Sequence, residues 1–264
     1  RLHNFSYIYF VQTLNRFIMM VRVNLLVALI LVSFTSVKGQ THSSLINRNL
    51  TQVNQQMNIV RTGGEAYALE DIEGTPYLTK AFERSQVLMK NGDTQSNGGM
   101  GFNIFIGNFE FKKQGTVYQL VNGTDIRQIE HQGRDFVYTP YHAASGKRYE
   151  SFLVRLVEGP CSIYKRPRVK FEGPQPAKTS FHNPKPPRFE KEDPFYFIQF
   201  KDQEVPRQIE SLRRGRFLDH FGSLENELKD YIKDQDIDLK DEEGLVRFIR
   251  YYNEHYDNSQ GKAQ

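Results

Sequence analysis

Three carboxylates at alternate positions are the first residues in this chain whose spacing could support chemistry. Asp234, Asp236 and Asp238 lie in the stretch DQDIDLKDEEGL, and a calcium-binding EF-hand loop also begins with carboxylates at alternate positions. Leu239, however, stands where that loop needs a glycine, and Leu245 stands where a bidentate glutamate should complete the calcium shell. We therefore expect no metal site here and interpret the stretch as an acidic loop between two helices.

Other residue types that could support catalysis or cofactor binding also lack a supporting pattern. The glycine-rich stretch NGGMG, residues 97–101, has no lysine of a phosphate-binding loop, so we expect a tight or bulged hairpin turn. The single cysteine, Cys161, has no local nucleophile signature, and the histidines have no metal-like spacing. We expect no catalytic residue, cofactor or metal. A hydrolase whose site is assembled from distant residues is kept as the second alternative.

A strand that alternates basic and apolar residues is the candidate partner-binding element. The stretch SIYKRPRVKF, residues 162–171, can offer a strand edge and positive charge to an envelope protein. The same charges, with Pro167, can instead keep an edge strand from pairing with other chains. The candidate partner-binding residues are Tyr164, Lys165, Arg166, Arg168 and Lys170.

An apolar ligand held inside a curved sheet is the first alternative function. Alternating apolar residues on successive strands would line such a cavity, and a carrier needs several hundred cubic ångströms of space among them. A filled core would exclude the carrier. The candidate lining residues are Phe102, Ile104, Phe109, Phe111, Phe152 and Val154.

Turn signals and apolar periodicity predict the elements that position these residues. From Tyr67 onward, pairs such as Gly107-Asn108, Gln132-Gly133 and Ser145-Gly146 recur at intervals of about 8 to 12 residues, which is typical of antiparallel strands. The stretches YESFLVRLV and FYFIQF are apolar on both faces, so the sheet must curl on itself or be covered by helices.

The last quarter of the chain changes to helical periodicity. Apolar residues are spaced for one face of a helix over residues 212–221, 224–232 and 245–252, and Ser223 and Asp241 are expected as N-caps. The predicted fold class is therefore α+β, with a curved antiparallel β-sheet or partial barrel and C-terminal helices packed against it.

The N-terminal residues predict export. Arg22 precedes VNLLVALILVSF, an apolar run of about a dozen residues, and the small and polar residues TSVKGQ follow, as in a secretory signal. A transmembrane helix needs ~20 apolar residues, so we expect cleavage near Gly39, no transmembrane segment in the mature chain, and a periplasmic or extracellular location. The expected divisions are 1–39 (upstream segment and signal peptide), 40–66 (polar N-terminal arm), 67–208 (β body with a Pro-rich excursion at 172–194) and 209–264 (helical subdomain).

Charge in the mature chain is balanced. The whole chain has 35 Lys and Arg against 31 Asp and Glu. The surplus of four is the number of basic residues in segment 1–39, which contains no carboxylate. The mature chain therefore has no overall electrostatic attraction to nucleic acid, and we expect no nucleic-acid partner.

Several stretches carry a resemblance to a known family. EGTPYLTKAFERSQVLM, the phenylalanine-rich hairpin after it, SFLVRLVEGPCSIYKR and the closing FLDHF…LENELKDYIKDQDIDLKDEEGLVRFIRYYN are similar in order and spacing to a family of uncharacterised exported proteins of Bacteroidota. The resemblance covers about Tyr67 to Asn253 and implies a cell-envelope location and a β-rich body with a helical tail. This chain departs from the family at Gly101–Phe105, where GFNIF replaces an RYN-like stretch.

Overall fold

The computed structural model describes residues 50–52, 59–62, 65–79, 82–113, 116–120, 125–177 and 183–256. All of them belong to one unit, Ile46–Gln264. The predicted leader, residues 1–39, lies outside the described residues. None of the helices within the described ranges is long and apolar enough to span a membrane.

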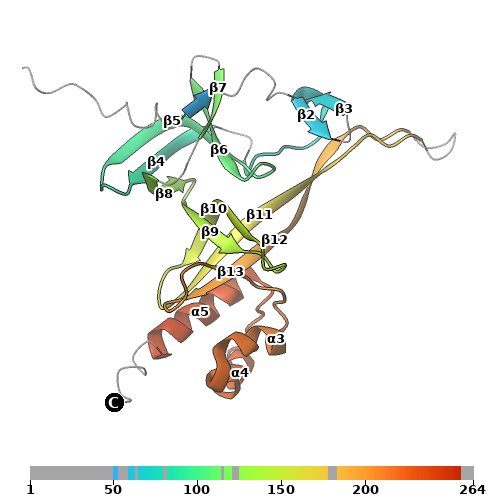
Figure 1. The fold of residues 1–264 in the computed structure, drawn as a ribbon. Coiled ribbons are helices and arrows are strands. Elements are labelled where there is room, and N and C mark those ends of the chain that lie inside the picture. The colour runs from blue at the N-terminus through green and yellow to red at the C-terminus, as the bar shows by residue number, and fades with distance from the viewer. Residues whose placement is uncertain are drawn as a thin grey trace, which may run out of the picture. The chain divides into compact units, whose positions relative to one another are not determined.

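The largest element of the described chain is one sheet, antiparallel except where β13 meets β9, and helices follow it (Figure 1). The strands are β1 (Leu50–Gln52), β2 (Ile59–Thr62), β3 (Glu65–Ala68), β4 (Glu83–Met89), β5 (Thr94–Asn103), β6 (Asn108–Lys113), β7 (Thr116–Leu120), β8 (Ile126–His131), β9 (Arg134–His142), β10 (Arg148–Val157), β11 (Cys161–Glu172), β12 (Arg188–Phe200) and β13 (Arg207–Gln208). The helical segments are η2 (Leu69–Asp71), α3 (Arg214–Leu218), η4 (Asp219–Leu224), α4 (Glu225–Asp234) and α5 (Glu242–Tyr256). The sheet order is β1-β7-β6-β5-β4-β8-β9-β10-β11-β12-β13, and β2 and β3 form a separate hairpin.

The last strand closes part of this sheet into a barrel. β13 pairs antiparallel with β12 and parallel with β9, so that β9 to β13 form a closed five-stranded barrel. The backbone N–H of His142 donates to the carbonyl of Pro206 at 2.9 Å, and the N–H of Ala144 donates to Gln208 Oε1 at 3.1 Å. The predicted α+β fold with a curved antiparallel sheet is confirmed, and the expected partial barrel is closed.

Successive side chains along each barrel strand point alternately into the barrel and away from it, so the apolar ones form three separate clusters. A small cluster fills the barrel interior, and the two larger clusters lie on its outer faces, one against β4–β6 and β8 and the other against the helices. A five-stranded barrel is narrow enough for side chains to fill. The interior cluster consists of Tyr141, Leu153 and Phe197, with Tyr164 and Phe195 packed against it.

Two prolines mark the point where the β11–β12 hairpin leaves the barrel. The pairing changes register between Arg166, which lies opposite Phe195, and Arg168, which lies opposite Glu192. Pro167 and the segment containing Pro194 occupy this break, where the missing N–H of proline interrupts no ladder hydrogen bond. The strands beyond the break form an arm. The predicted Pro-rich excursion at 172–194 is shorter than expected, because β12 already begins at Arg188.

The C-terminal helix is attached to the barrel by a side-chain amide. Cys161 N–H donates to Asn253 Oδ1 at 2.8 Å, and Asn253 Nδ2 donates to the Cys161 carbonyl at 2.9 Å. A Cβ on Gly159 would lie 2.4 Å from Asn253 Nδ2, so only glycine allows this approach. At the other end of α5, Asp241 Oδ2 accepts from Gly244 N–H at 3.1 Å, which confirms the predicted N-cap.

Three local predictions were wrong. Residues 97–101 lie inside β5 and contain a bulge, because Asn97 pairs with Ser85 whereas Met100 pairs with Glu83. Ser223 lies inside η4 and does not cap α4, whose N-cap position is Leu224. The segment expected as a polar arm contributes β1, which pairs with β7, and β2, which pairs with β3.

The amide attachment predicts a large stability loss for Asn253→Ala. The substitution leaves the backbone N–H and carbonyl of the buried Cys161 without partners, and each unsatisfied buried group costs about 1–3 kcal/mol. Urea unfolding should show a loss of about 2–4 kcal/mol. Asn226→Ala, at an exposed position of α4, is the control and should stay within about 0.5 kcal/mol of the wild type. Equal effects of the two substitutions would contradict the attachment.

Candidate functional site

Three of the four basic residues predicted to bind a partner are neutralised within the chain. The partner carboxylates come from β11 itself, from β12 and from the first turn of α5, so these three side chains are not free basic groups. The ion pairs are Lys165 with Glu242 at 2.5 Å, Arg168 with Glu192 at 2.6 Å, and Lys170 with Glu172 at 2.8 Å and Glu190 at 3.0 Å. The fifth predicted residue, Tyr164, donates to Gln199 Oε1 at 3.0 Å.

The strand carrying these residues is also not a sheet edge where it forms the barrel. From Ile163 to Lys165, β11 pairs with β10 on one side and with β12 on the other. Its backbone groups in this stretch are therefore already used in two ladders. A partner strand, which the sequence predicted to pair along this edge, therefore finds no free backbone groups between Ile163 and Lys165.

Arg166 differs from the other basic residues of β11. Its Nη1 donates to the hydroxyl of Tyr141 at 2.8 Å, and it makes no ion pair with any described carboxylate. Burial raises the pKa of the Tyr141 phenol, so this hydroxyl stays protonated and retains a hydrogen to donate. Arg166 and Phe195 form the last residue pair of the barrel before the proline break.

A cavity of about 490 Å³ opens beside Arg166 at this end of the barrel. We call it the barrel-mouth pocket. Aromatic rings from β9, β10 and β12 form one part of its wall, and the β5–β6 turn forms another. Polar side chains complete the wall, among them the carboxylate of Glu150 beside Ser151. Its principal lining residues are Ile106, Tyr138, Tyr141, Tyr149, Arg166 and Phe195.

A buried polar group holds the β5–β6 turn in place. Asn103 Oδ1 accepts from the N–H groups of Phe105 at 3.1 Å and Ile106 at 3.3 Å, and its Nδ2 donates to Glu110 at 3.0 Å. The hydroxyl of Tyr77, from the EGTPYL segment, also donates to Glu110. Burial raises the pKa of the Glu110 carboxyl. Tyr77 does not line the pocket itself. It affects the pocket indirectly, because its hydrogen bond to Glu110 helps to hold the β5–β6 turn in place.

Gly107 brings the backbone of this turn close to the guanidinium. Its φ of +70° is in the left-handed region, and Ser151 Oγ donates to its carbonyl at 3.2 Å. A Cβ at this position would lie 3.0 Å from Ser151 Oγ and 3.8 Å from Arg166 Nη2. Glycine therefore leaves open the space in front of Arg166.

Exposed apolar side chains gather at the rim of the pocket. In the described part of the chain, the exposed large hydrophobic residues are Phe105 (40% exposed), Ile106 (41%) and Tyr149 (47%). Ile106 and Tyr149 line the pocket, and Phe105 precedes Ile106 in the turn. An exposed apolar cluster on a folded protein marks an interaction site more often than an isolated exposed side chain does.

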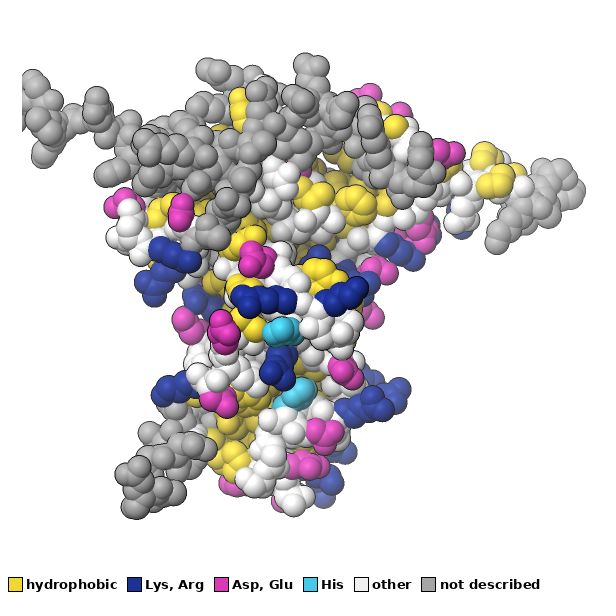
Figure 2. Space-filling view, in the orientation of Figure 1, with side chains coloured by type: hydrophobic (Ala, Val, Ile, Leu, Met, Phe, Trp, Pro, Cys, Tyr) yellow, Lys and Arg dark blue, Asp and Glu magenta, His cyan; other side chains and the backbone are white. Residues whose placement is uncertain are grey.

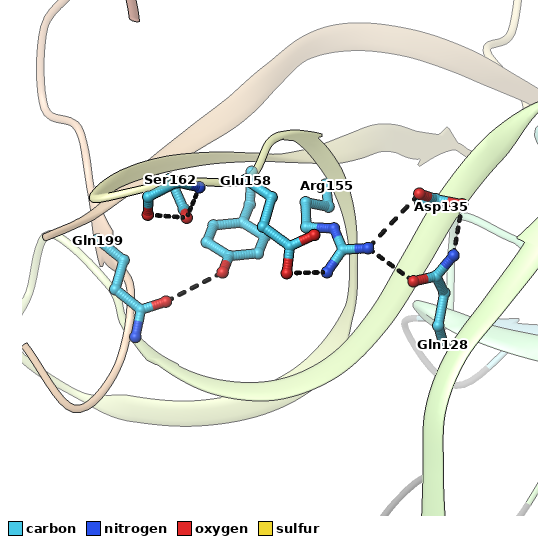
Figure 3. A network of polar contacts seen from close by, with 8 residues as sticks. Gln128, Asp135, Arg155, Glu158, Ser162 and Gln199 are labelled. Atoms are coloured by element: carbon cyan, nitrogen blue, oxygen red, sulfur yellow. Dashed lines mark hydrogen bonds and ion pairs between the residues drawn. The ribbon is translucent and has the colours of Figure 1, made fainter. Parts of the chain in front are cut away.

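The neighbouring arginine on β10 shows the opposite arrangement. Arg155 lies 3.0 Å from Glu158 and 3.5 Å from Asp135, and it donates to Gln128 Oε1 at 2.6 Å (Figure 3). In Figure 3 both terminal nitrogens of this guanidinium meet polar acceptors. Arg155 is therefore a satisfied structural arginine, whereas Arg166 has only a phenol as its described side-chain hydrogen-bond partner.

The residues predicted to line an apolar cavity pack against one another. Phe102, Phe109 and Phe152 are at most 2% exposed, and the ring centroids of Phe109 lie 5.1 Å from those of both Phe102 and Phe152. Ile104 and Val154 are buried in the same cluster, and Phe111 packs against it. These contacts are those of a hydrophobic core, and they do not favour the carrier.

The groups best suited to nucleophilic catalysis are buried. Cys161 is fully buried and burial raises the pKa of its thiol, which disfavours the reactive thiolate. Ser85 Oγ lies 2.8 Å from His131 Nδ1, but the two residues are 1% and 0% exposed, and the ring of Phe109 covers the imidazole. This pair joins β4 to β8 and has no access for a substrate.

The acidic loop at Asp234–Asp238 joins α4 to α5. Asp238 Oδ1 accepts from the Lys240 N–H at 2.9 Å, and Ile237 and Leu239 enter the helical core. Among the residues with described coordinates, no group of three or more His, Cys, Asp or Glu side chains is arranged to hold a metal ion.

Sequence reasoning named Arg166 as a candidate but did not name the tyrosines around it, apart from Tyr164 on the same strand. The predicted turn at Ser145-Gly146 contained the missing signal, because a hairpin there places Tyr141 opposite Tyr149, as the structure does. The contribution of the β5–β6 turn had no comparable signal, since it depends on contacts between residues distant in sequence. No known protein family, curated protein or solved structure matches this chain.

The buried Ser85–His131 pair predicts that the protein loses stability in mild acid. Burial lowers the pKa of His131 below its ordinary value of 6.5. As the pH falls through 6.5, the unfolded chain takes up a proton that the folded chain does not, so folding is weakened. His131→Gln should therefore lose less stability than the wild type between pH 7 and pH 5, measured by urea unfolding.

Ser85→Ala is the matched variant for this measurement. It removes the hydrogen-bond partner but keeps the buried imidazole, so the loss of stability on acidification should persist. A difference in unfolding free energy between the wild type and His131→Gln that stays constant from pH 7 to pH 5 would contradict the assignment, and this difference is independent of the raised pKa of Glu110.

Proposed function

We propose that this chain is an exported, non-catalytic binding protein of the cell envelope, and that its barrel-mouth pocket binds a segment of another protein. One observation carries the proposal: Arg166, which has no described carboxylate partner, lies in a pocket rimmed by the exposed Ile106 and Tyr149. Export rests on the signal-like pattern of residues 1–39, as predicted from the sequence.

The composition of the pocket favours binding. Arginine and tyrosine are enriched among the residues that contribute most to protein–protein affinity. The planar guanidinium of Arg166 presents several N–H donors in a fixed fork that fits a carboxylate. In the described structure only Nη1 has a side-chain acceptor, the Tyr141 hydroxyl. The remaining donors are suited to an acceptor supplied by a ligand.

The apolar rim favours a polypeptide over a carbohydrate. Ile106 and Phe105 expose hydrophobic surface next to the charged group. A protein segment can supply an apolar side chain for this rim and a carboxylate for Arg166 from adjacent positions. A sugar acid supplies the carboxylate but has no aliphatic side chain to cover Ile106.

The absence of catalysis is part of the proposal. The thiol of Cys161 and the Ser85–His131 pair are buried, and the pocket itself contains a guanidinium, phenols and Glu150. A guanidinium is effectively always protonated and does not act as a general base. These groups are suited to recognition.

The proposal predicts that Arg166→Gln weakens the binding of peptides that are selected with the wild-type protein. A random octapeptide library with free C-termini, screened against the mature protein, should yield binders that carry a carboxylate next to a large apolar side chain. Loss of one charge-assisted contact costs about 1.5–3 kcal/mol, so the affinity of these peptides for Arg166→Gln should fall about 10- to 100-fold.

Lys170→Gln is the matched control. Lys170 lies on the same strand, but it is paired with Glu172 and Glu190 on the arm, so its removal should leave peptide affinity unchanged. Equal losses in the two variants would instead support a general basic surface. Binding of acidic polysaccharides with no peptide binders would contradict a polypeptide ligand.

A further inference from the structure

The barrel-mouth pocket is closed behind Arg166. Leu153 and Phe197 are fully buried and Tyr141 is 2% exposed, and these three side chains fill the barrel interior. Tyr141 and Phe195 belong both to the pocket wall and to this interior cluster or its packing shell. A ligand that enters the mouth therefore cannot continue through the barrel.

The pocket has an extension along the outside of the barrel. A second depression, of about 690 Å³, shares Ala143 and Gln208 with the barrel-mouth pocket and continues to His142 and Arg207. Histidine side chains lie beside Lys or Arg side chains on the face shown in Figure 2. The two depressions therefore adjoin at Ala143 and Gln208.

We propose that the pocket recognises the C-terminus of a partner polypeptide. This inference rests on the proposed function and specifies which part of the partner enters. The terminal carboxylate binds the guanidinium of Arg166, the last side chain packs against Tyr149 and Phe195, and the preceding residues pass over Ala143 and Gln208 into the second depression.

The geometry favours a terminus over an internal acidic residue. A chain end needs a single line of approach to Arg166, and the depression that adjoins the pocket at Ala143 and Gln208 supplies one. A terminal carboxylate also brings its own side chain on the same Cα, which places an apolar group beside the charged one.

The donors that would bind the carboxylate come from two residues. Arg166 Nη1 is used by Tyr141, and Nη2 faces the open space beside Gly107. Nη2 can donate to one carboxylate oxygen, and the Tyr141 hydroxyl, which accepts from Arg166, can donate its own hydrogen to the ligand. A carboxylate held by a guanidinium and a phenol forms charge-assisted hydrogen bonds, which are about twice as strong as neutral ones.

The test compares free and amidated peptide C-termini on the wild-type protein. An octapeptide library without Asp or Glu contains one carboxylate per peptide, at the C-terminus. The best binders from this library are resynthesised as C-terminal amides, which removes the charge and keeps every side chain. The dissociation constants are measured by fluorescence anisotropy with the wild type and with Arg166→Gln.

The inference predicts that amidation weakens binding to the wild type by about tenfold or more, and that Arg166→Gln binds the acid and amide forms equally. If acid and amide bind the wild type equally while Arg166→Gln weakens both, the C-terminus is excluded and the proposed pocket stands. If this library yields no binder while peptides containing Asp or Glu bind through Arg166, the inference also fails and the proposed function stands.

Discussion

The pairing of β13 with both β12 and β9 is the constraint on which the described structure depends. Only two residues, Arg207 and Gln208, form this strand, yet they convert the end of an open sheet into a closed barrel. Closure gives the side chains of Tyr141, Leu153 and Phe197 an interior. It also directs the chain from the barrel to α3, so that the helices can cover the outer face formed by Ile163 and Ile198.

Two local features then determine what the open end of the barrel presents. The proline break after Arg166 ends the barrel and turns the rest of the β11–β12 hairpin into an arm. The Asn103–Glu110–Tyr77 group holds the β5–β6 turn over the opening, so that Ile106 and Gly107 become one wall. Arg166, which has no carboxylate partner among the described residues, therefore lies beside exposed apolar side chains. This arrangement contributes little to the free energy of folding and is suited to binding a ligand.

The fold was largely predictable, because periodicity and turn residues are local signals. Alternation in YESFLVRLV predicted a strand with two apolar faces, and the structure buries Phe152 and Leu153 on opposite sides of β10. The spacing of Leu245, Phe248 and Ile249 predicted the buried face of α5. The tight or bulged hairpin turn predicted at residues 97–101 is instead a bulge inside β5, because a glycine-rich stretch looks the same in a turn and in a bulged strand.

The candidate site was less predictable, because it depends on which charges meet. The sequence shows four basic residues on one strand, but their carboxylate partners lie on β11, β12 and α5. Only Arg166 faces the barrel mouth without such a partner among the described residues. Tyr77 and Glu110 are 33 residues apart, and no local pattern relates them to the turn that they stabilise.

The most direct measurement compares the stabilities of Arg166→Met and Arg155→Met in the absence of any ligand. Methionine keeps much of the apolar stem of each arginine and removes its charge. If Arg166 serves binding, its replacement should lower the free energy of unfolding by no more than about 1 kcal/mol, because it removes a single hydrogen bond, the one to the Tyr141 hydroxyl. Arg155→Met, which strips Asp135, Glu158 and Gln128 of their partner, should lose about 1–2 kcal/mol. A loss in Arg166→Met as large as that in Arg155→Met would show that Arg166 is structural and would contradict the assignment of a binding site.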